Sequence, residues 1–258
     1  MPFPRVKGQA YESSNHIPLA IRWPKGINGR GRVVTDYVSF ADLAPTFIEA
    51  AKVGQIAPIM QSITGRSLLE VFRSHKSGRV IPDRDHVLIG KERHDIGRPN
   101  NWGYPIRGIV KKDMLYLHNF KPNRWPSGHP LTGYLNCDGS PTKTTILNQR
   151  RNGISHFWNL NFGKRQKEEL FDLKQDVDCI NNLARSERHS ELKEKLKEEL
   201  FAELRKQGDP RMIGKGDVFD NYPYSGKSTD NFFQRYQSGE KVKAGWVSSS
   251  DFEKEKLD

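Results

Sequence analysis

Residues 190–207 place the strongest constraint on the fold of this chain. In SELKEKLKEELFAELRKQ, leucine recurs at every fourth position from Leu192 to Leu204. Glutamate and lysine alternate on the other positions at i,i+4 spacing, which stabilises a helix. Gly208 follows directly and Pro210 soon after, which is typical of a helix C-terminus. The apolar stripe is narrow, so the helix is predicted to pack on a sheet or on another helix.

Two segments earlier in the chain are predicted to supply strands. Residues 86–90 (HVLIG) form a short apolar run. Residues 104–120 (YPIRGIVKKDMLYLHNF) are typical of a β-hairpin, with the turn at Lys111–Asp113. Strands together with helices indicate an α/β or α+β domain.

Two more segments have local signals for regular structure. The run Ile17–Trp23 (IPLAIRW) is short, apolar and closed by Pro24, which predicts a buried strand. Residues 33–53 are predicted to form a short strand followed by a helix, with Ser39 as its N-cap. The apolar face predicted for this helix consists of Phe40, Leu43, Phe47, Ile48 and Ala51.

The composition favours a folded chain with anionic partners. The 258 residues carry 42 lysines and arginines against 31 aspartates and glutamates, a formal net charge of +11. This balance suits nucleic acid, acidic glycans or an anionic membrane surface, and does not choose among them. No apolar run approaches the roughly 20 residues of a membrane span, and the first residues, MPFPRVKG, lack the apolar region that is typical of a signal peptide. Neither Cys137 nor Cys179 lies in a zinc-binding pattern.

The loop at residues 91–105, KERHDIGRPNNWGYP, is a candidate binding site. It follows a predicted strand, and strand ends carry ligand sites in α/β folds. Cations suit sulfate or carboxylate, amides suit hydroxyls, and an aromatic face suits a sugar ring. The alternative interpretation is a solvated basic loop. The candidate set is Lys91, Arg93, His94, Arg98, Asn100, Asn101, Trp102 and Tyr104.

Several motifs in the same order resemble the sulfatase family of the alkaline-phosphatase-like superfamily. PFPRVKG and YESSNHIPLAIRWP resemble a segment that follows a metal-binding Asp-Asn-Gly turn in sulfatases. Val38-Ser39, Asp42-Leu43 and Pro45-Thr46 match a structural motif, so Asp42 is expected to be a helix N-terminal charge. Residues 168–184 resemble a strand of the family's smaller C-terminal sheet. The nearest subgroup is the N-sulfoglucosamine sulfohydrolase (heparan N-sulfatase) type.

The resemblance implies a set of site residues. Lys7 matches the cation of the family's sulfate pocket. The hairpin residue Arg107 either approaches that site or anchors its hairpin through a buried ion pair. The residues expected to bind substrate are His94, Arg93, Arg98, Asn101 and Arg107.

The resemblance also implies a cofactor and a modified nucleophile. In the family, a hydrated formylglycine made from Cys-x-Pro/Ala-x-Arg attacks sulfur, and a calcium ion polarises the sulfate oxygens. Neither Cys137 nor Cys179 has that motif. We therefore expect the nucleophile and the metal ligands upstream of Met1, and no calcium bound by this chain alone.

The expected fold class is α/β, as the C-terminal part of a sulfatase fold, with a smaller antiparallel sheet packed by a long C-terminal helix. Residues 1–85 are expected to come from the large α/β domain and residues 86–210 to form a smaller sheet-and-helix subdomain. Residues 211–258 are expected to be an extended polar tail that is solvated at its end. The location implied by the family is periplasmic, secreted or lysosomal.

The expected family activity is hydrolysis of sulfate esters or sulfamates on carbohydrates such as glycosaminoglycans. The chain itself is expected to be a truncated, inactive fragment, and its expected partner is a sulfated carbohydrate. No recognised nucleic-acid-binding motif occurs, so no nucleic acid is expected. The alternative function is a non-catalytic basic module that binds sulfated glycans or other polyanions. A fragment unable to fold is the third interpretation.

Overall fold

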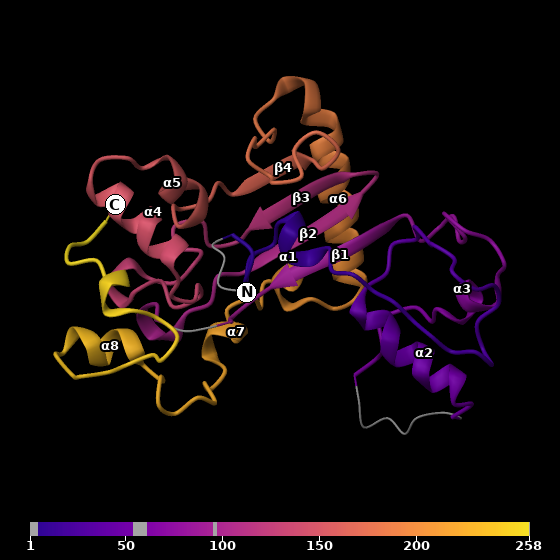
Figure 1. The fold of residues 1–258 in the computed structure, drawn as a ribbon, viewed down its shortest axis with the longest axis horizontal. Helices are drawn as coiled ribbons and strands as arrows, with labels where there is room; N and C mark the ends of the chain where they lie inside the picture. Colours follow the sequence, from indigo (N-terminus) through magenta and orange to yellow (C-terminus); the bar gives the residue numbers. More distant parts are fainter. Residues whose placement is uncertain (1–4, 54–60, 95–96, 258) are drawn as a thin grey trace. The chain divides into compact units, whose positions relative to one another are not determined.

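The computed structural model describes residues 5–53, 61–94 and 97–257 (Figure 1). Contacts divide the chain into two units. Unit 1 comprises residues 1–17, 89–109 and 113–258, and unit 2 comprises residues 18–88 and 110–112. The three-part division expected from the sequence stays a prediction. No helix in the described ranges combines the length and the apolar character that crossing a membrane requires.

The regular elements are short apart from one helix. The helices are α1 Glu12–Asn15, α2 Leu43–Ala50, α3 Leu69–Arg73, α4 Pro141–Arg151, α5 His156–Asn161, α6 Ser190–Lys206, α7 Val218–Asn221 and α8 Phe232–Gln237. The strands are β1 His86–Lys91, β2 Ile106–Lys111, β3 Met114–Asn119 and β4 Glu168–Asp172. Single 3-10 turns lie between them, including η1 Phe40–Asp42, η2 Pro99–Asn101 and η6 Ser249–Asp251.

The four strands form one sheet in the order β1-β2-β3-β4. Strands β2 and β3 form the predicted hairpin, and the two residues between them, Lys112 and Asp113, have φ of 48° and 61°. Positive φ at both positions is the geometry of a type I′ turn, whose twist matches that of the strands it joins. Strand β4 pairs antiparallel with β3, with His118 opposite Glu168. The expected small antiparallel sheet is therefore confirmed.

Helix α6 packs on one face of this sheet, as its leucine repeat predicts. Leu196, Leu200 and Leu204 are its buried residues. The ring of Phe201 lies 5.2 Å from that of His118 in β3. Figure 1 shows α6 running behind the strands, so the expected α/β class with a long helix on the sheet is confirmed.

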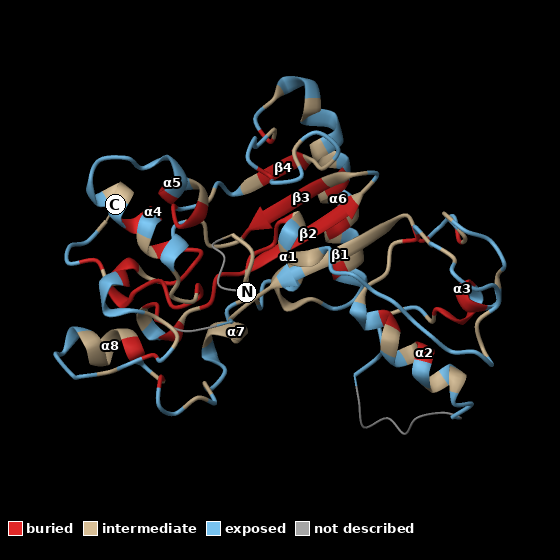
Figure 2. Ribbon diagram, in the orientation of Figure 1, coloured by how far each residue is buried: buried red, intermediate tan, exposed pale blue. Residues whose placement is uncertain are grey.

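The alternation of side chains along β4 assigns its two faces. Glu168 pairs with Lys197 of α6 at 3.0 Å. The next residue, Glu169, accepts from the Tyr11 hydroxyl at 3.0 Å, just before α1. Successive strand residues point to opposite faces, so Tyr11 covers the face that α6 leaves open. Figure 2 shows β2, β3 and β4 largely buried between these layers.

Unit 2 has a small core, and two sequence predictions are wrong there. Ser39 and Asp42 form a capping box, and Asp42 also pairs with Arg84 at 2.9 Å, so its structural role is confirmed. The run Ile17–Trp23 is not a strand, because no strand in the described chain pairs with it, and its apolar side chains are exposed. The predicted apolar face of α2 is exposed at Phe40 and Phe47. The core consists of Leu68, Leu69, Val71, Phe72 and Ile81.

The C-terminal region is more tightly packed than the sequence predicts. Phe232 in helix α8 is fully buried. Asp251 and Glu253, expected to be solvated, are also buried, because Lys143 pairs with the first and Arg150 with the second. The expectation of a solvated end is therefore wrong for these residues.

Candidate functional site

The turn that carries Lys7 is held firmly in unit 1. The Arg5 guanidinium donates to the carbonyl of Leu160 at 2.7 Å and lies 3.8 Å from the centre of the Tyr11 ring. Gln9, two residues after Lys7, is buried. These contacts fix the backbone on both sides of Lys7. The Pro-Phe-Pro motif at residues 2–4 lies outside the described residues.

Lys7 forms an ion pair with Asp138. Its Nζ lies 2.6 Å from Asp138 Oδ1, and the two side chains are 30% and 26% exposed. An ammonium group has three N–H donors, so one bond to Asp138 does not exhaust it. A partly exposed pair of this kind contributes about 0–1 kcal/mol. The Lys7 ammonium can therefore donate further hydrogen bonds to an anion that approaches it.

Gly8 brings His94 beside Lys7. Gly8 has a φ of +65°, and a Cβ at this position would lie 3.7 Å from Cγ and Nδ1 of His94 and 3.8 Å from the carbonyl oxygen of Asn136. The ammonium group of Lys91 donates to the carbonyl of Gly8. His94 is exposed to solvent. The structure thus places Lys91 and His94 against Gly8, the residue after Lys7, although the sequence separates the two segments.

Internal acceptors hold both Arg98 and Arg107, and their expected substrate-binding roles stay predictions. Arg98 is 1% exposed and donates to the carbonyls of Trp125 and Pro126 at 2.6 and 2.8 Å. Arg107 pairs with Asp209 at 2.6 Å, which corresponds to the buried ion pair left open by the sequence. Because both guanidinium groups already bind internal acceptors, the proposed site does not include them.

Arg93 and Asn101 attach the same loop to the C-terminal region. Arg93 donates to the carbonyl of Tyr222 at 2.8 Å. The Asn101 amide donates to Asp230 at 2.5 Å and accepts from the backbone N–H of Asn231 at 3.0 Å. These bonds position the loop that carries His94. The expected substrate-binding roles of Arg93 and Asn101 stay predictions.

A hollow of about 410 Å³ opens beside Asp138. Sequence analysis did not identify it, because its two sides come from segments more than a hundred residues apart. The Asp138-Gly139 pair is an ordinary turn signal, and Trp246 stands alone in a polar stretch. The lining residues are Asp138, Gly139, Gly245, Trp246, Val247 and Ser248.

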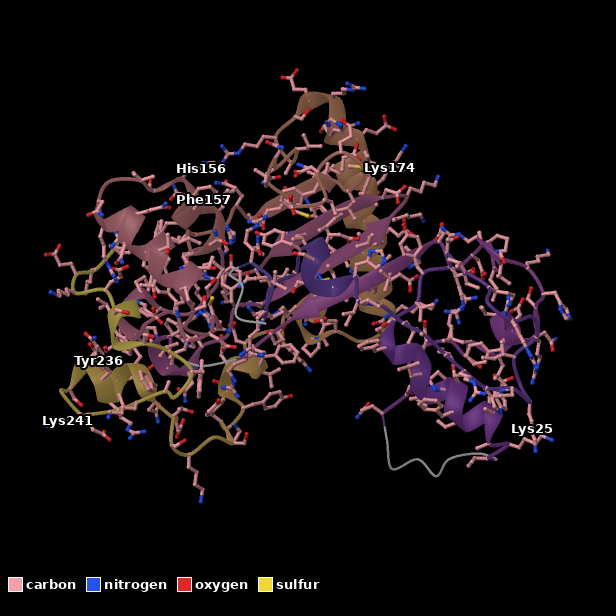
Figure 3. All side chains as sticks on the ribbon, in the orientation of Figure 1. Lys25, His156, Phe157, Lys174, Tyr236 and Lys241 are labelled. Atoms are coloured by element: carbon pink, nitrogen blue, oxygen red, sulfur yellow. The ribbon has the colours of Figure 1, made fainter. Side chains whose placement is uncertain are left out.

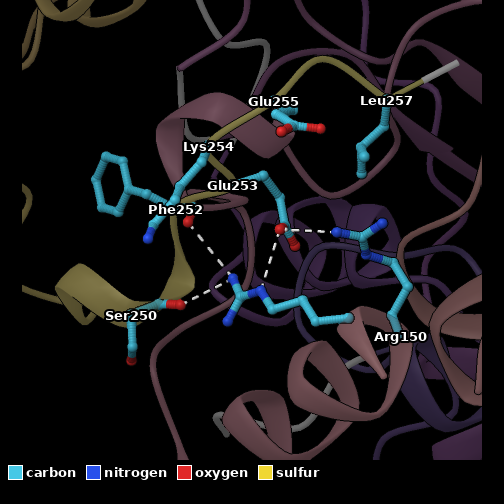
Figure 4. A pocket seen from close by; sticks show the side chains of 8 residues that line it. Arg150, Ser250, Phe252, Glu253, Lys254, Glu255 and Leu257 are labelled. Carbon is cyan, nitrogen blue, oxygen red and sulfur yellow. Dashed lines mark hydrogen bonds and ion pairs between the residues drawn. The ribbon is translucent and has the colours of Figure 1, made fainter. Parts of the chain in front are cut away.

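A second hollow, of about 430 Å³, lies between α4 and the chain end (Figure 4). Its two arginines are occupied by internal acceptors. Arg150 and Arg151 both bind Glu253, at 2.8 and 3.1 Å, and Arg151 also donates to the carbonyls of Ser250 and Phe252. This cluster holds the C-terminal segment on α4.

The cysteines are poor nucleophiles in this structure. Cys137 is 3% exposed, and burial raises the pKa of its thiol to about 11. Burial also raises the pKa of the Cys179 thiol to about 11. Because the thiolate is the reactive form, neither cysteine is activated at neutral pH. This agrees with the absence of a formylglycine motif around them.

Comparison with known proteins confirms the resemblance to the C-terminal portion of sulfatases. Residues 6–86 match the family model described as N-sulphoglucosamine sulphohydrolase, C-terminal. An ulvan-active sulfatase of Formosa agariphila is 27% identical over 201 residues, which cover 77% of this chain and 35% of that protein. The N-sulphoglucosamine sulphohydrolase of Homo sapiens is 26% identical over 208 residues, 78% of this chain and 38% of that protein.

The chain therefore spans 35–38% of the length of these curated relatives. Among solved structures, BT4656 in complex with its substrate D-glucosamine-2-N,6-O-disulfate is similar with a TM-score of 0.46 and 17% identity. That match covers 73% of this chain and 28% of the other.

Proposed function

We propose that this chain forms the substrate-binding part of a carbohydrate sulfatase, with Lys7 as the cation that receives the sulfate group. The observation that carries the proposal is the position of Lys7. It lies on a fixed turn within the segment that matches the sulfohydrolase family model, next to the exposed His94. A sulfated sugar is the substrate class that this family resemblance supports. The protein would be periplasmic, secreted or lysosomal.

The chemistry that these residues supply is charge stabilisation. The Lys7 ammonium can donate to sulfate oxygens while it keeps its bond to Asp138, and such charge-assisted bonds are the stronger class of hydrogen bond. The His94 ring, which lies against the neighbouring Gly8, would add a ring nitrogen near the sulfate. This arrangement would orient a sulfate ester or sulfamate and would balance the negative charge that builds up as the S–O or S–N bond breaks.

The residues around Lys7 do not form a calcium site by themselves. A calcium ion takes about 6–8 oxygen ligands. Among the described residues, the carboxylate that contacts Lys7 is that of Asp138, and it already binds the Lys7 ammonium.

We also propose that the 258 residues alone bind sulfated sugars without hydrolysing them, because neither cysteine has the nucleophile motif. Release of sulfate by the purified chain would contradict this.

The test of the proposed function is binding of glucosamine 2-N-sulfate to the full chain, measured by calorimetry. Lys7→Ala should weaken binding about 10- to 150-fold, since a bond to a charged group contributes about 1.5–3 kcal/mol. Asp138→Asn should strengthen binding, because it removes a negative charge beside the sulfate. The matched control is Lys241→Ala, an equal charge change at an exposed lysine labelled in Figure 3, which should leave affinity unchanged.

The alternative function, a polyanion-binding module, makes a different prediction for the same variants. The exposed lysines labelled in Figure 3, Lys25, Lys174 and Lys241, come from separate segments. A module that recognises only charge would lose the same affinity when any one of these lysines, or Lys7, is replaced by alanine. It would also bind DNA with an affinity that falls strongly as the salt concentration rises. Equal losses at Lys7 and Lys241 would therefore support this alternative and overturn the sulfatase proposal.

A further inference from the structure

The hollow beside Asp138 has a fixed wall. The Trp246 indole N–H donates to the carbonyl of Leu135 at 2.8 Å. The backbone N–H of Gly139 donates to the carbonyl of Trp246 at 2.6 Å. These two bonds join residues 135–139 to the C-terminal segment across the hollow. A wall held in this way does not have to be ordered when a ligand arrives.

Gly139 shows how closely the two segments approach. A Cβ at this position would lie 3.2 Å from the backbone nitrogen of Ser248, 3.3 Å from its hydroxyl and 3.4 Å from Asp251 Oδ2. Asp251 also accepts from the N–H of Ser248 at 3.0 Å and pairs with the buried Lys143 at 3.2 Å. The position of Ser248 in the wall is therefore set by a buried ion pair.

Asp138 connects the hollow to the proposed sulfate position. Its Oδ1 binds Lys7, and among the described residues its Oδ2 has no hydrogen-bond partner. Asp138 lines the hollow together with Trp246 and Ser248. A carboxylate oxygen accepts from hydroxyls, a serine hydroxyl donates and accepts, and an aromatic residue supplies apolar surface. These are the groups that recognise an uncharged, hydroxyl-rich ring.

We propose that this hollow is a subsite for a second sugar unit, adjacent to the sulfated unit held by Lys7. This inference rests on the proposed function. The ligand is a disaccharide or longer chain whose neighbouring ring presents hydroxyls to Asp138 and an apolar face to Trp246. The Asp138 carboxylate disfavours a second anionic group at this place, because like charges repel.

The test compares two probes on the full chain by calorimetry. One is glucosamine 2-N-sulfate, and the other is a disaccharide with this residue at its non-reducing end and an unsulfated neutral hexose after it. The disaccharide should bind about tenfold more tightly. Trp246→Ala should remove that gain and leave the monosaccharide affinity unchanged, which also shows that the variant is folded. Trp246→Phe should restore most of the gain.

The control is Phe157→Ala, at an aromatic residue that is 51% exposed and labelled in Figure 3 but does not line the hollow. It should keep the full gain. If the monosaccharide binds but the disaccharide binds no more tightly, or if Trp246→Ala keeps the gain, the subsite is overturned and the proposed function stands. If neither sugar binds, both proposals are overturned.

Discussion

Replacing Asp251 by asparagine should destabilise unit 1 strongly. Lys143 and Asp251 are both 0% exposed, and Lys143 Nζ lies 3.2 Å from Asp251 Oδ2. The same ammonium donates to the carbonyls of Gly133 and Cys137 at 2.8 and 2.7 Å. Asp251→Asn keeps the shape of the side chain but leaves a buried ammonium without its counter-charge. Breaking a buried pair in this way costs about 3–5 kcal/mol.

The lower end of that range applies here, about 3 kcal/mol, because two carbonyl acceptors remain for the ammonium. Burial lowers the pKa of Lys143, and Asp251 opposes that shift. Losing Asp251 therefore makes Lys143 easier to deprotonate, which limits the cost further. Replacing both partners, Lys143→Met with Asp251→Leu, should recover only part of the stability. No charge is then buried, but the carbonyls of Gly133 and Cys137 and the N–H of Ser248 lose these hydrogen-bond partners.

The assay is urea denaturation followed by tryptophan fluorescence, with hydrogen exchange measured at residues 246–253. The matched control is Glu191→Gln, which breaks the exposed pair between Glu191 and Lys195 and should leave stability unchanged. Faster exchange in residues 246–253 with a lower urea midpoint is the expected result for Asp251→Asn. A loss below about 1 kcal/mol, or one equal to that of the control, would refute the reasoning.

Two further predictions concern pH and reactivity. Although burial acts to raise it, hydrogen bonds from Tyr116 and Lys197 lower the pKa of Glu168 to about 2 from an ordinary 4.5. The stabilising effect of ionised Glu168 should therefore be full above pH 4.5 and should disappear as the pH falls towards 2. Across that pH window the urea midpoint should drop less steeply in Glu168→Gln than in the unmodified protein. Equal slopes would contradict this. A thiol reagent at pH 8 should label Cys137 and Cys179 slowly in the native protein and rapidly in urea, because burial raises both thiol pKa values. Rapid labelling of the native protein would contradict the burial of these thiols.

Elements with strong local signals were predictable from the sequence. The leucine repeat of α6, the turn of the β2–β3 hairpin and the Ser39 cap each depend on residues within a few positions of one another. Helix α4 was missed, because its buried face consists of Lys143, Ile146 and Leu147, and a lysine does not signal a buried position. The run Ile17–Trp23 shows the opposite error, since apolar residues alone do not supply a partner strand.

The candidate site was predictable only in part. The family motif indicates Lys7 and the basic loop at residues 91–105 indicates His94, and the structure places His94 against Gly8, the residue after Lys7. The pairing of Lys7 with Asp138 joins residues 131 positions apart, and no local pattern encodes it. The internal acceptors of Arg98 and Arg107 were not predictable in the same way, because a sequence shows the charge of an arginine and not its acceptors. Those acceptors are mostly backbone carbonyls and distant carboxylates.

The discontinuous make-up of unit 1 has a consequence for biosynthesis. Ribosomes add about 5–20 residues per second, so roughly 7–26 s separate the synthesis of Lys7 from that of Asp138. Residues 18–88 of unit 2 are made in that interval and are available to fold first. Trp246 and Asp251 are translated later still. Lys7 therefore stays without its partner until Asp138 has left the ribosome, and the hollow beside Asp138 is complete only after residues 246–253 have followed.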